Sequence, residues 1–208
     1  MKRGAFGIQM HSGWGVLVAV STDAGLIEIL DRRRILTVDP ETSGAKQPYH
    51  HAATLAPPES EKHIANCMAT STQLALTALN EVRRELSGRQ CQIGGCALLL
   101  ASGRPLPPLA KILASHPLIH TAEGEFFRQT IRCACEALHI PVTAIREREL
   151  DAQAARAFGK AAARMQQSIA GLSSSIGPPW TRDHKNATLA AAVILAGENT
   201  VGTRGSIS

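Results

Sequence analysis

Three short β-type segments at the start of the chain constrain the fold more than any other feature. Residues 5–10 and 14–21 are almost wholly apolar, and residues 26–38 are rich in β-branched and apolar side chains. A turn over residues 21–25 separates the second segment from the third. Short strands linked by tight turns are typical of an antiparallel meander. We therefore expect three neighbouring antiparallel strands before the first helix.

Strands and helices alternate along the rest of the chain. The spacing of apolar residues predicts helices over residues 61–86, 106–115, 121–139, 149–169 and 183–196. The apolar runs at residues 91–101 and 140–145 predict two more strands. Antiparallel strands followed by strand–helix alternation predict an α/β fold, with a mixed five-stranded sheet flanked by helices.

The predicted elements form one domain. Residues 1–196 hold every expected strand and helix, and an apolar fraction of 44% is enough for a single core. Residues 39–60 are rich in proline, include the pair His50-His51, and predict a long loop. Residues 197–208 predict a flexible tail.

Charge and cysteine content narrow the class of protein. The formal net charge of +5 is compatible with a nucleic-acid partner, but aromatic residues are only 3% of the chain, too few for binding by base stacking. The five cysteines are odd in number and lack CxxC spacing, which indicates reduced thiols and a cytoplasmic protein. No apolar run approaches the roughly 18 residues of a membrane span, so we expect no membrane partner.

A tight polar cluster precedes the apolar helix near the C-terminus. Its sequence is Trp180-Thr181-Arg182-Asp183-His184-Lys185-Asn186. Side chains in the first turn of a helix project beside unpaired backbone N–H groups, so a cluster at this position can hold a site.

This cluster is one of three patches that carry a resemblance to a known architecture. The others are Phe6-Gly7-Ile8-Gln9, which leads to Gly13-Trp14-Gly15-Val16, and the long helix before Cys96-Ala97-Leu98-Leu99-Leu100. In element order and in these short patterns, residues 5–196 resemble the ribonuclease H-like superfamily. The resemblance is to the RuvC-type Holliday-junction resolvase branch in particular.

The resemblance implies two-metal phosphodiester hydrolysis, which needs several converging carboxylates. The family places an Asp in the first strand, a Glu at the end of the fourth strand, and two Asp three residues apart in the last helix. In this chain Gln9 stands at the first position, and Ala101-Ser102-Gly103 holds no acid at the second. Asp183 and Asn186 stand at the last two. Because one acid of four is kept, we expect no two-metal nuclease. The sequence itself requires no cofactor, and the resemblance implies Mg²⁺ or another divalent metal.

Three sets of polar residues are candidates for a site at the strand ends. The first is a catalytic or metal site made of His120, Glu123 and Asp183, with His116 or His184 as further ligands. The four- and three-residue steps from His116 to Glu123 fit one helix face, although Pro117 interrupts them. The second is an anion site made of Arg104, His184 and Lys185 at the start of the last helix. The third is a nucleophilic site made of Ser102 with His120 or His184.

Each of these sets also has a purely structural interpretation. Loop histidines are common without a metal, Asp183 can cap its helix, and Lys185 can be solvated. The missing acids favour a non-catalytic binding or scaffold module of a bacterial-type protein, which can form a homodimer through an alanine-rich helix as the resolvase branch does. The alternatives are a metal-dependent phosphoesterase or nuclease with a non-standard site, and a nucleic-acid or phosphate binder without catalysis. We expect no enzymatic activity, and hydrolysis of phosphate esters is the expected reaction of the alternative.

Overall fold

The computed structural model of this chain describes residues 1–23, 26–101 and 105–204. An antiparallel meander made of β1 (Lys2–His11), β2 (Trp14–Asp23) and β3 (Leu26–Leu36) forms three of the five strands of its sheet. Gly13 makes the turn between β1 and β2 at a positive φ of 80°, which brings His11 opposite Trp14. The three predicted antiparallel strands are therefore confirmed.

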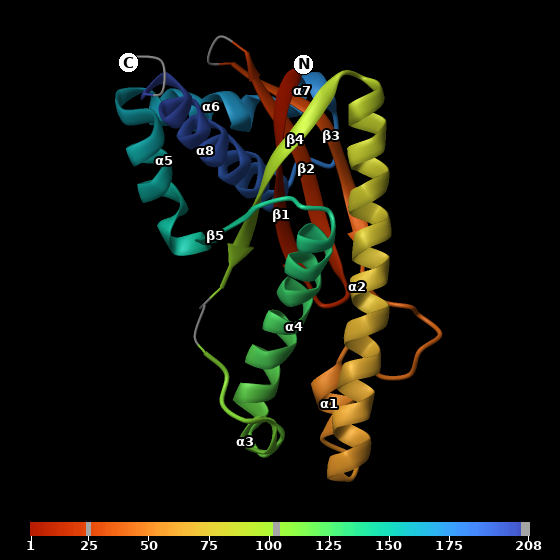
Figure 1. The fold of residues 1–208 in the computed structure, drawn as a ribbon. Helices are drawn as coiled ribbons and strands as arrows, with labels where there is room; N and C mark the ends of the chain where they lie inside the picture. The colour runs from red at the N-terminus through yellow and green to blue at the C-terminus, as the bar shows by residue number, and fades with distance from the viewer. Residues whose placement is uncertain (24–25, 102–104, 205–208) are drawn as a thin grey trace.

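Two parallel strands complete the sheet. β4 (Cys91–Leu100) pairs with β1, and β5 (Val142–Arg146) pairs with β4, which gives the order β3-β2-β1-β4-β5. The first strand of the chain is thus the central one, with a neighbour on each side. This arrangement confirms the predicted mixed five-stranded sheet, and Figure 1 shows its long twisted strands between the helices.

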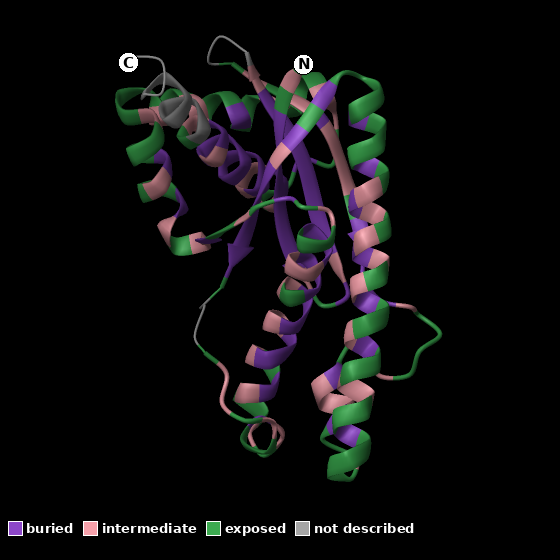
Figure 2. Cartoon of the chain, viewed as in Figure 1, coloured by how far each residue is buried: buried purple, intermediate pink, exposed green. Residues whose placement is uncertain are grey.

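Helices cover both faces of the sheet. α2 (Pro57–Gly88) and α4 (His116–Ala137) pack on one face, over a core that includes Phe6, Ile8 and Leu98. α8 (Arg182–Arg204) crosses the other face and contacts β1, β2 and β4. α5 (Leu150–Phe158) and α6 (Ala162–Gly171) pack beside α8 over Ala97 and Leu99 of β4. Figure 2 shows buried strands at the centre of the molecule, with α2, α4 and α5 exposed on their outer sides and the described side chains of α8 largely buried.

The first half of α4 extends beyond the sheet. In Figure 1, the start of α4, α3 (Leu109–Leu113) and α1 (Pro48–Ala52) lie together below the strands, next to the lower part of α2. A small separate core of Ile112, Ile119 and Ala122 holds them, with Tyr49 packed against it. This projection is where the histidines of α1 and α4 meet.

Several predicted boundaries are corrected. The loop predicted over residues 39–60 contains α1, and proline at the first positions lets α2 begin at Pro57 and α4 at His116, earlier than apolar spacing indicated. Proline is accepted there because its missing N–H has no partner in the first turn. The single helix predicted over 149–169 is interrupted at Gly159, whose φ is 54°.

The interrupted segment is made of four elements. They are η1 (Glu147–Glu149), α5, η2 (Gly159–Ala161) and α6. α7 (Ser173–Ile176) lies between the helices predicted over residues 149–169 and 183–196, and α8 continues to Arg204 through part of the predicted tail. Residues 205–208 lie outside the described residues.

α8 approaches β1 unusually closely at one point. A Cβ added to Gly7 would lie 1.8 Å from the carbonyl oxygen of Ala187. Only a glycine therefore fits at this crossing, and the small buried side chains of Ala187, Ala190 and Ala191 let the helix lie flat on the strands. This contact positions the first turn of α8, with its polar cluster, beside the end of β1.

Among the described residues, no helix combines the length and the apolar character needed to cross a membrane.

Candidate functional site

The end of β1 and the start of α8 form the first candidate site, which we call the sheet-edge site. Its central contact joins His11 Nε2 to Asp183 Oδ2 at 2.9 Å. The carboxylate accepts this bond while it lies at the N-terminus of α8, where the helix dipole also favours negative charge. Asp183, the one acid that matches the resolvase pattern, is therefore hydrogen-bonded to a histidine of the neighbouring strand.

Two amides accompany Asp183 in place of carboxylates. Gln9 lies on β1 between Gly7, which contacts α8 at Ala187, and His11, which contacts it at Asp183. Its side chain is buried, and its Oε1 has no hydrogen-bond partner within the described part of the chain. Asn186 is half-buried one turn after Asp183, on the same side of α8. Two positions where the resemblance implies acids therefore carry no charge.

An aromatic hollow adjoins the sheet-edge site. The His11 ring stacks on Trp14 with a centroid separation of 4.3 Å and an interplanar angle of 16°. The guanidinium carbon of Arg34 lies 4.2 Å from the centroid of the same Trp14 ring. The hollow has a volume of about 470 Å³ and extends to Thr181 and Asp183. It therefore combines one exposed cation, one aromatic ring and one helix N-terminus.

The three consecutive arginines of β3 have three different roles. Arg32 donates hydrogen bonds to four backbone carbonyls of residues 176–179 and so holds the segment that leads into α8. Arg33 points to the other face, where it pairs with Asp31 and with Glu85 of α2. Arg34 is exposed and has no carboxylate partner among the described residues. Of the three, Arg34 is the one available to an anion.

His184 caps the start of α8. Its Nδ1 accepts hydrogen bonds from the backbone N–H of Thr181 at 3.3 Å and from the Thr181 hydroxyl at 2.8 Å. Burial, together with nearby Arg32, lowers the pKa of His184. The ring is therefore neutral near pH 7 and supplies no positive charge to the predicted anion site.

Lys185 and Arg104 are the other members of the predicted anion site, and Ser102 is the nucleophile of the predicted nucleophilic site. Lys185 is half-exposed in the first turn of α8 and has no side-chain partner among the described residues. Arg104 and Ser102 lie outside the described residues. The anion site made of Arg104, His184 and Lys185 stays a prediction.

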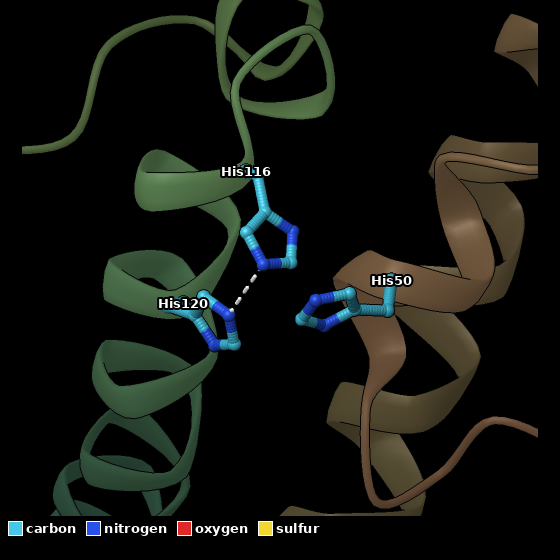
Figure 3. Close-up of side chains that lie close together, drawn as sticks. All are labelled: His50, His116 and His120. Carbon is cyan, nitrogen blue, oxygen red and sulfur yellow. Dashed lines mark hydrogen bonds between the residues drawn. The ribbon is translucent and has the colours of Figure 1, made fainter.

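Three histidines gather at the second candidate site, which we call the histidine cluster. It is made of His50 on α1 and of His116 and His120 on α4. One ring nitrogen of each lies within 4.8 Å of the others, and Nε2 of His116 is 3.0 Å from Nε2 of His120. Figure 3 shows the three rings facing one another across the gap between the two helices.

Glu123 of α4 contacts this cluster through hydrogen bonds to His50. Its carboxylate is buried, with 5% of the side chain exposed, and accepts a hydrogen bond from His50 Nδ1 at 2.8 Å. It also accepts one from the backbone N–H of His50 at 3.2 Å. Within the described residues, His50 is the only ion-pair partner of this buried carboxylate.

The structure divides the predicted metal site between two places. His116 and His120 lie together as their spacing implied. Glu123 is not among the converging ligand atoms and contacts the cluster through His50, and Asp183 lies at the sheet-edge site, hydrogen-bonded to His11. In Figure 1 the start of α4 lies well below the start of α8. Sequence reasoning did not place His50 with the cluster or His11 with Asp183. The pair His50-His51 in a long loop was the only local signal for the former.

Similarity to known proteins is found among solved structures, at the level of the backbone fold. No model of a known protein family matches the chain, and no curated protein sequence matches it. A structure of Thermus thermophilus RuvC in complex with a Holliday junction substrate matches with a TM-score of 0.54 at 13% identity. A second T. thermophilus RuvC structure matches with a TM-score of 0.52 at 14% identity. Each match covers 95% of this chain and 96% of the RuvC chain. The order of the strands, their pairing and these full-length matches together show that the chain has the ribonuclease H-like fold of the RuvC structures.

Proposed function

We propose that this chain is a nucleic-acid-binding module that uses the ribonuclease H-like fold without two-metal hydrolysis at the sheet edge. The observation that carries the proposal is the pairing of Asp183 with His11, beside the uncharged Gln9 and Asn186. Two divalent cations need several carboxylates to balance their charge, and this site offers one that already has a partner.

The aromatic hollow supports contact with a phosphate-bearing ligand. Arg34 is exposed, rests on Trp14, and adjoins the N-terminus of α8, where unpaired N–H groups favour anions. A guanidinium held on an aromatic ring keeps its donors in one plane, which suits a phosphate. One of the similar RuvC structures is bound to a Holliday junction, so four-way junctions and duplexes are the first ligands to test.

Binding to fluorescent DNA across a salt series tests the proposal. We expect a duplex or four-way junction to bind wild-type protein, with log K falling as log salt rises. Arg34→Gln should reduce the magnitude of the slope by about 1, as expected for the loss of one phosphate contact. Arg83→Gln, which changes an exposed arginine of α2 in the same way, is the control and should leave the slope unchanged. Affinity that does not change with salt, or equal slopes for the two variants, would refute the proposal.

Restoring acids tests the absence of two-metal chemistry. The double variant Gln9→Asp/Asn186→Asp should gain a Mg²⁺-dependent rise in melting temperature that the wild type lacks. At a Mg²⁺ concentration ten times its Kd, the gain is about 1.4 kcal/mol, or roughly 3–6 °C for a chain of this size. Adding Asp183→Asn should abolish the gain. An equal Mg²⁺ effect on wild-type protein would show that the sheet edge already holds the ion.

A second candidate, a metal-dependent phosphoesterase, is supported by the histidine cluster. Three imidazoles around one ion leave a position for water, which a bound metal can activate. Hydrolysis of an aryl phosphate mono- or diester by Zn²⁺-loaded wild-type protein, and its loss in His120→Asn, would favour this candidate. No turnover above that of His120→Asn would reject it.

Self-association remains a prediction. Four alanines of α8, Ala187 and Ala190 to Ala192, are buried against the sheet, whereas Ala152 of α5 and Ala163 of α6 are exposed, so we expect an alanine-mediated homodimer to use α5 or α6. Sedimentation analysis over a concentration series measures it directly, and a monomer at every concentration would reject it.

A further inference from the structure

We propose that His50, His116 and His120 bind one Zn²⁺ ion, and that Glu123 is the positioning residue for His50. This inference goes beyond nucleic-acid binding and does not depend on it, whereas the phosphoesterase candidate depends on this inference. It rests on the convergence of ring nitrogens from two helices and on a buried carboxylate behind one of them.

The two histidines of α4 have the spacing of a helical metal pair. Residues four apart on a helix lie on one face, so His116 and His120 present their rings side by side. Their Nε2 atoms are 3.0 Å apart. Two nitrogens bound about 2.0–2.1 Å from one tetrahedral Zn²⁺ are roughly 3.3 Å apart, so only a small rotation of the rings is needed.

The third histidine comes from α1 and is oriented by Glu123. Because the carboxylate accepts a hydrogen bond from His50 Nδ1–H, the lone pair of that ring lies on Nε2, the nitrogen available to a metal. The backbone N–H of His50 bonds to the same carboxylate oxygen, so both the backbone and the ring of His50 are held. These two hydrogen bonds to one carboxylate oxygen fix one tautomer and one ring direction of His50, which is the usual role of a carboxylate behind a metal-binding histidine.

The negative charge of Glu123 favours a cation at the histidine cluster. Glu123 is buried, and among the described residues no lysine or arginine pairs with it. A buried carboxylate is costly unless a positive charge compensates it. A dication bound to His50 would lie one imidazole away and would offset that negative charge without a direct bond.

The ligand set selects the kind of metal. Three imidazoles with no carboxylate in the inner shell suit Zn²⁺ and other late transition metals, whereas Mg²⁺ and Ca²⁺ prefer oxygen ligands. His116 and His120 are exposed, so the fourth position faces solvent and would hold water. Bound Zn²⁺ would also tie α1 to α4 and so fix the chain between β3 and α2.

Zinc titration of tag-free, chelator-treated protein tests the inference. Calorimetry should show one equivalent of Zn²⁺ bound by wild-type protein, and Co²⁺ should give the visible absorption of a tetrahedral site. Millimolar Mg²⁺ should not compete. His120→Asn should weaken Zn²⁺ binding at least about 100-fold, because it removes an inner ligand. The control is His139→Asn, which removes an exposed histidine at a φ of 56° that asparagine tolerates, and it should bind like wild type.

The role of Glu123 needs a readout that folding alone would not change. Glu123→Gln keeps an oxygen that can accept the His50 hydrogen bonds but removes the charge. We expect apo-protein melting close to wild type with Zn²⁺ affinity lowered about 10–100-fold, the usual loss for such partners. Unchanged affinity in Glu123→Gln would overturn the positioning role. Absence of stoichiometric Zn²⁺, or equal affinity in His120→Asn and His139→Asn, would overturn the metal site. Neither result alters the salt dependence of DNA binding by Arg34→Gln.

Discussion

Replacing Gly7 by alanine should displace α8 from the sheet. The added Cβ would lie 1.8 Å from the carbonyl oxygen of Ala187, whereas real Cβ contacts are essentially never shorter than 3.0 Å. The strand and the helix must therefore separate by at least the difference, 1.2 Å. Neither side yields easily, because β1 is paired on both edges and Ala187 is completely buried.

The expected cost follows from the nature of the contact. Overpacking a well-packed core costs about 1–3 kcal/mol, and a clash between two backbones belongs at the upper end because no side chain can rotate away. We expect a loss of about 3 kcal/mol in the free energy of unfolding. For a chain of this size that loss lowers the melting temperature by roughly 6–12 °C.

Circular dichroism during urea and thermal unfolding measures both quantities. The matched control is Gly88→Ala at the end of α2, the same chemical change at a site with no atom within 4 Å. Alanine should stabilise that helix by up to about 1 kcal/mol. If Gly7→Ala unfolds within about 0.5 kcal/mol of wild type, α8 does not lie on β1 at this point, and the position assigned to Asp183 beside His11 is refuted.

Three further outcomes are expected. Arg32→Lys should lower the free energy of unfolding by about 1–3 kcal/mol, because an ammonium cannot reach the four carbonyls of residues 176–179. Urea unfolding measures this loss, and an unchanged urea midpoint would contradict the contact. Folding lowers the pKa of His184, so the unfolded chain binds a proton first as pH falls below about 6.5. The free energy of unfolding should therefore fall below this pH, and less steeply in His184→Asn. Equal slopes of stability against pH in the two proteins would refute a neutral His184 at the start of α8. Cys96 is completely buried and contacts the thiol of Cys135. This contact and the burial raise the pKa of Cys96 well above the ordinary value. Mass spectrometry after thiol labelling at pH 8 should therefore find Cys133 modified before Cys96, and the reverse order would contradict the burial.

Much of the fold could be predicted because its signals are local. Apolar runs and turns identify the three strands of the meander, and three- and four-residue spacing identifies α2, α4 and α8. The errors occur where one residue decides the outcome. Gly159 interrupts a segment whose composition is helical throughout, and Pro117 begins α4 where it was expected to break a helix. In both cases the backbone preference of that one residue, which apolar periodicity does not report, sets the boundary.

The histidine cluster could be predicted only in part for a related reason. His116, His120 and Glu123 lie within one helix, so their spacing alone brings them to one face. His50 comes from α1, and its approach depends on how the chain between β3 and α2 packs against α4 through Tyr49. Contacts between distant segments leave no periodic trace in a single sequence.

Each candidate site holds one carboxylate, and the surroundings of that carboxylate decide what the site can bind. Asp183 lies partly exposed at a helix N-terminus, so solvent and the helix dipole already stabilise its charge, and one carboxylate alone offers little to attract a dication. Glu123 is buried and accepts a hydrogen bond from His50, whose ring lies beside two more imidazoles. There the negative charge acts through the ring and makes it a better metal ligand. The surroundings of the two carboxylates therefore favour metal binding at the projecting ends of α1 and α4, and not at the sheet edge, where the fold resemblance implies it.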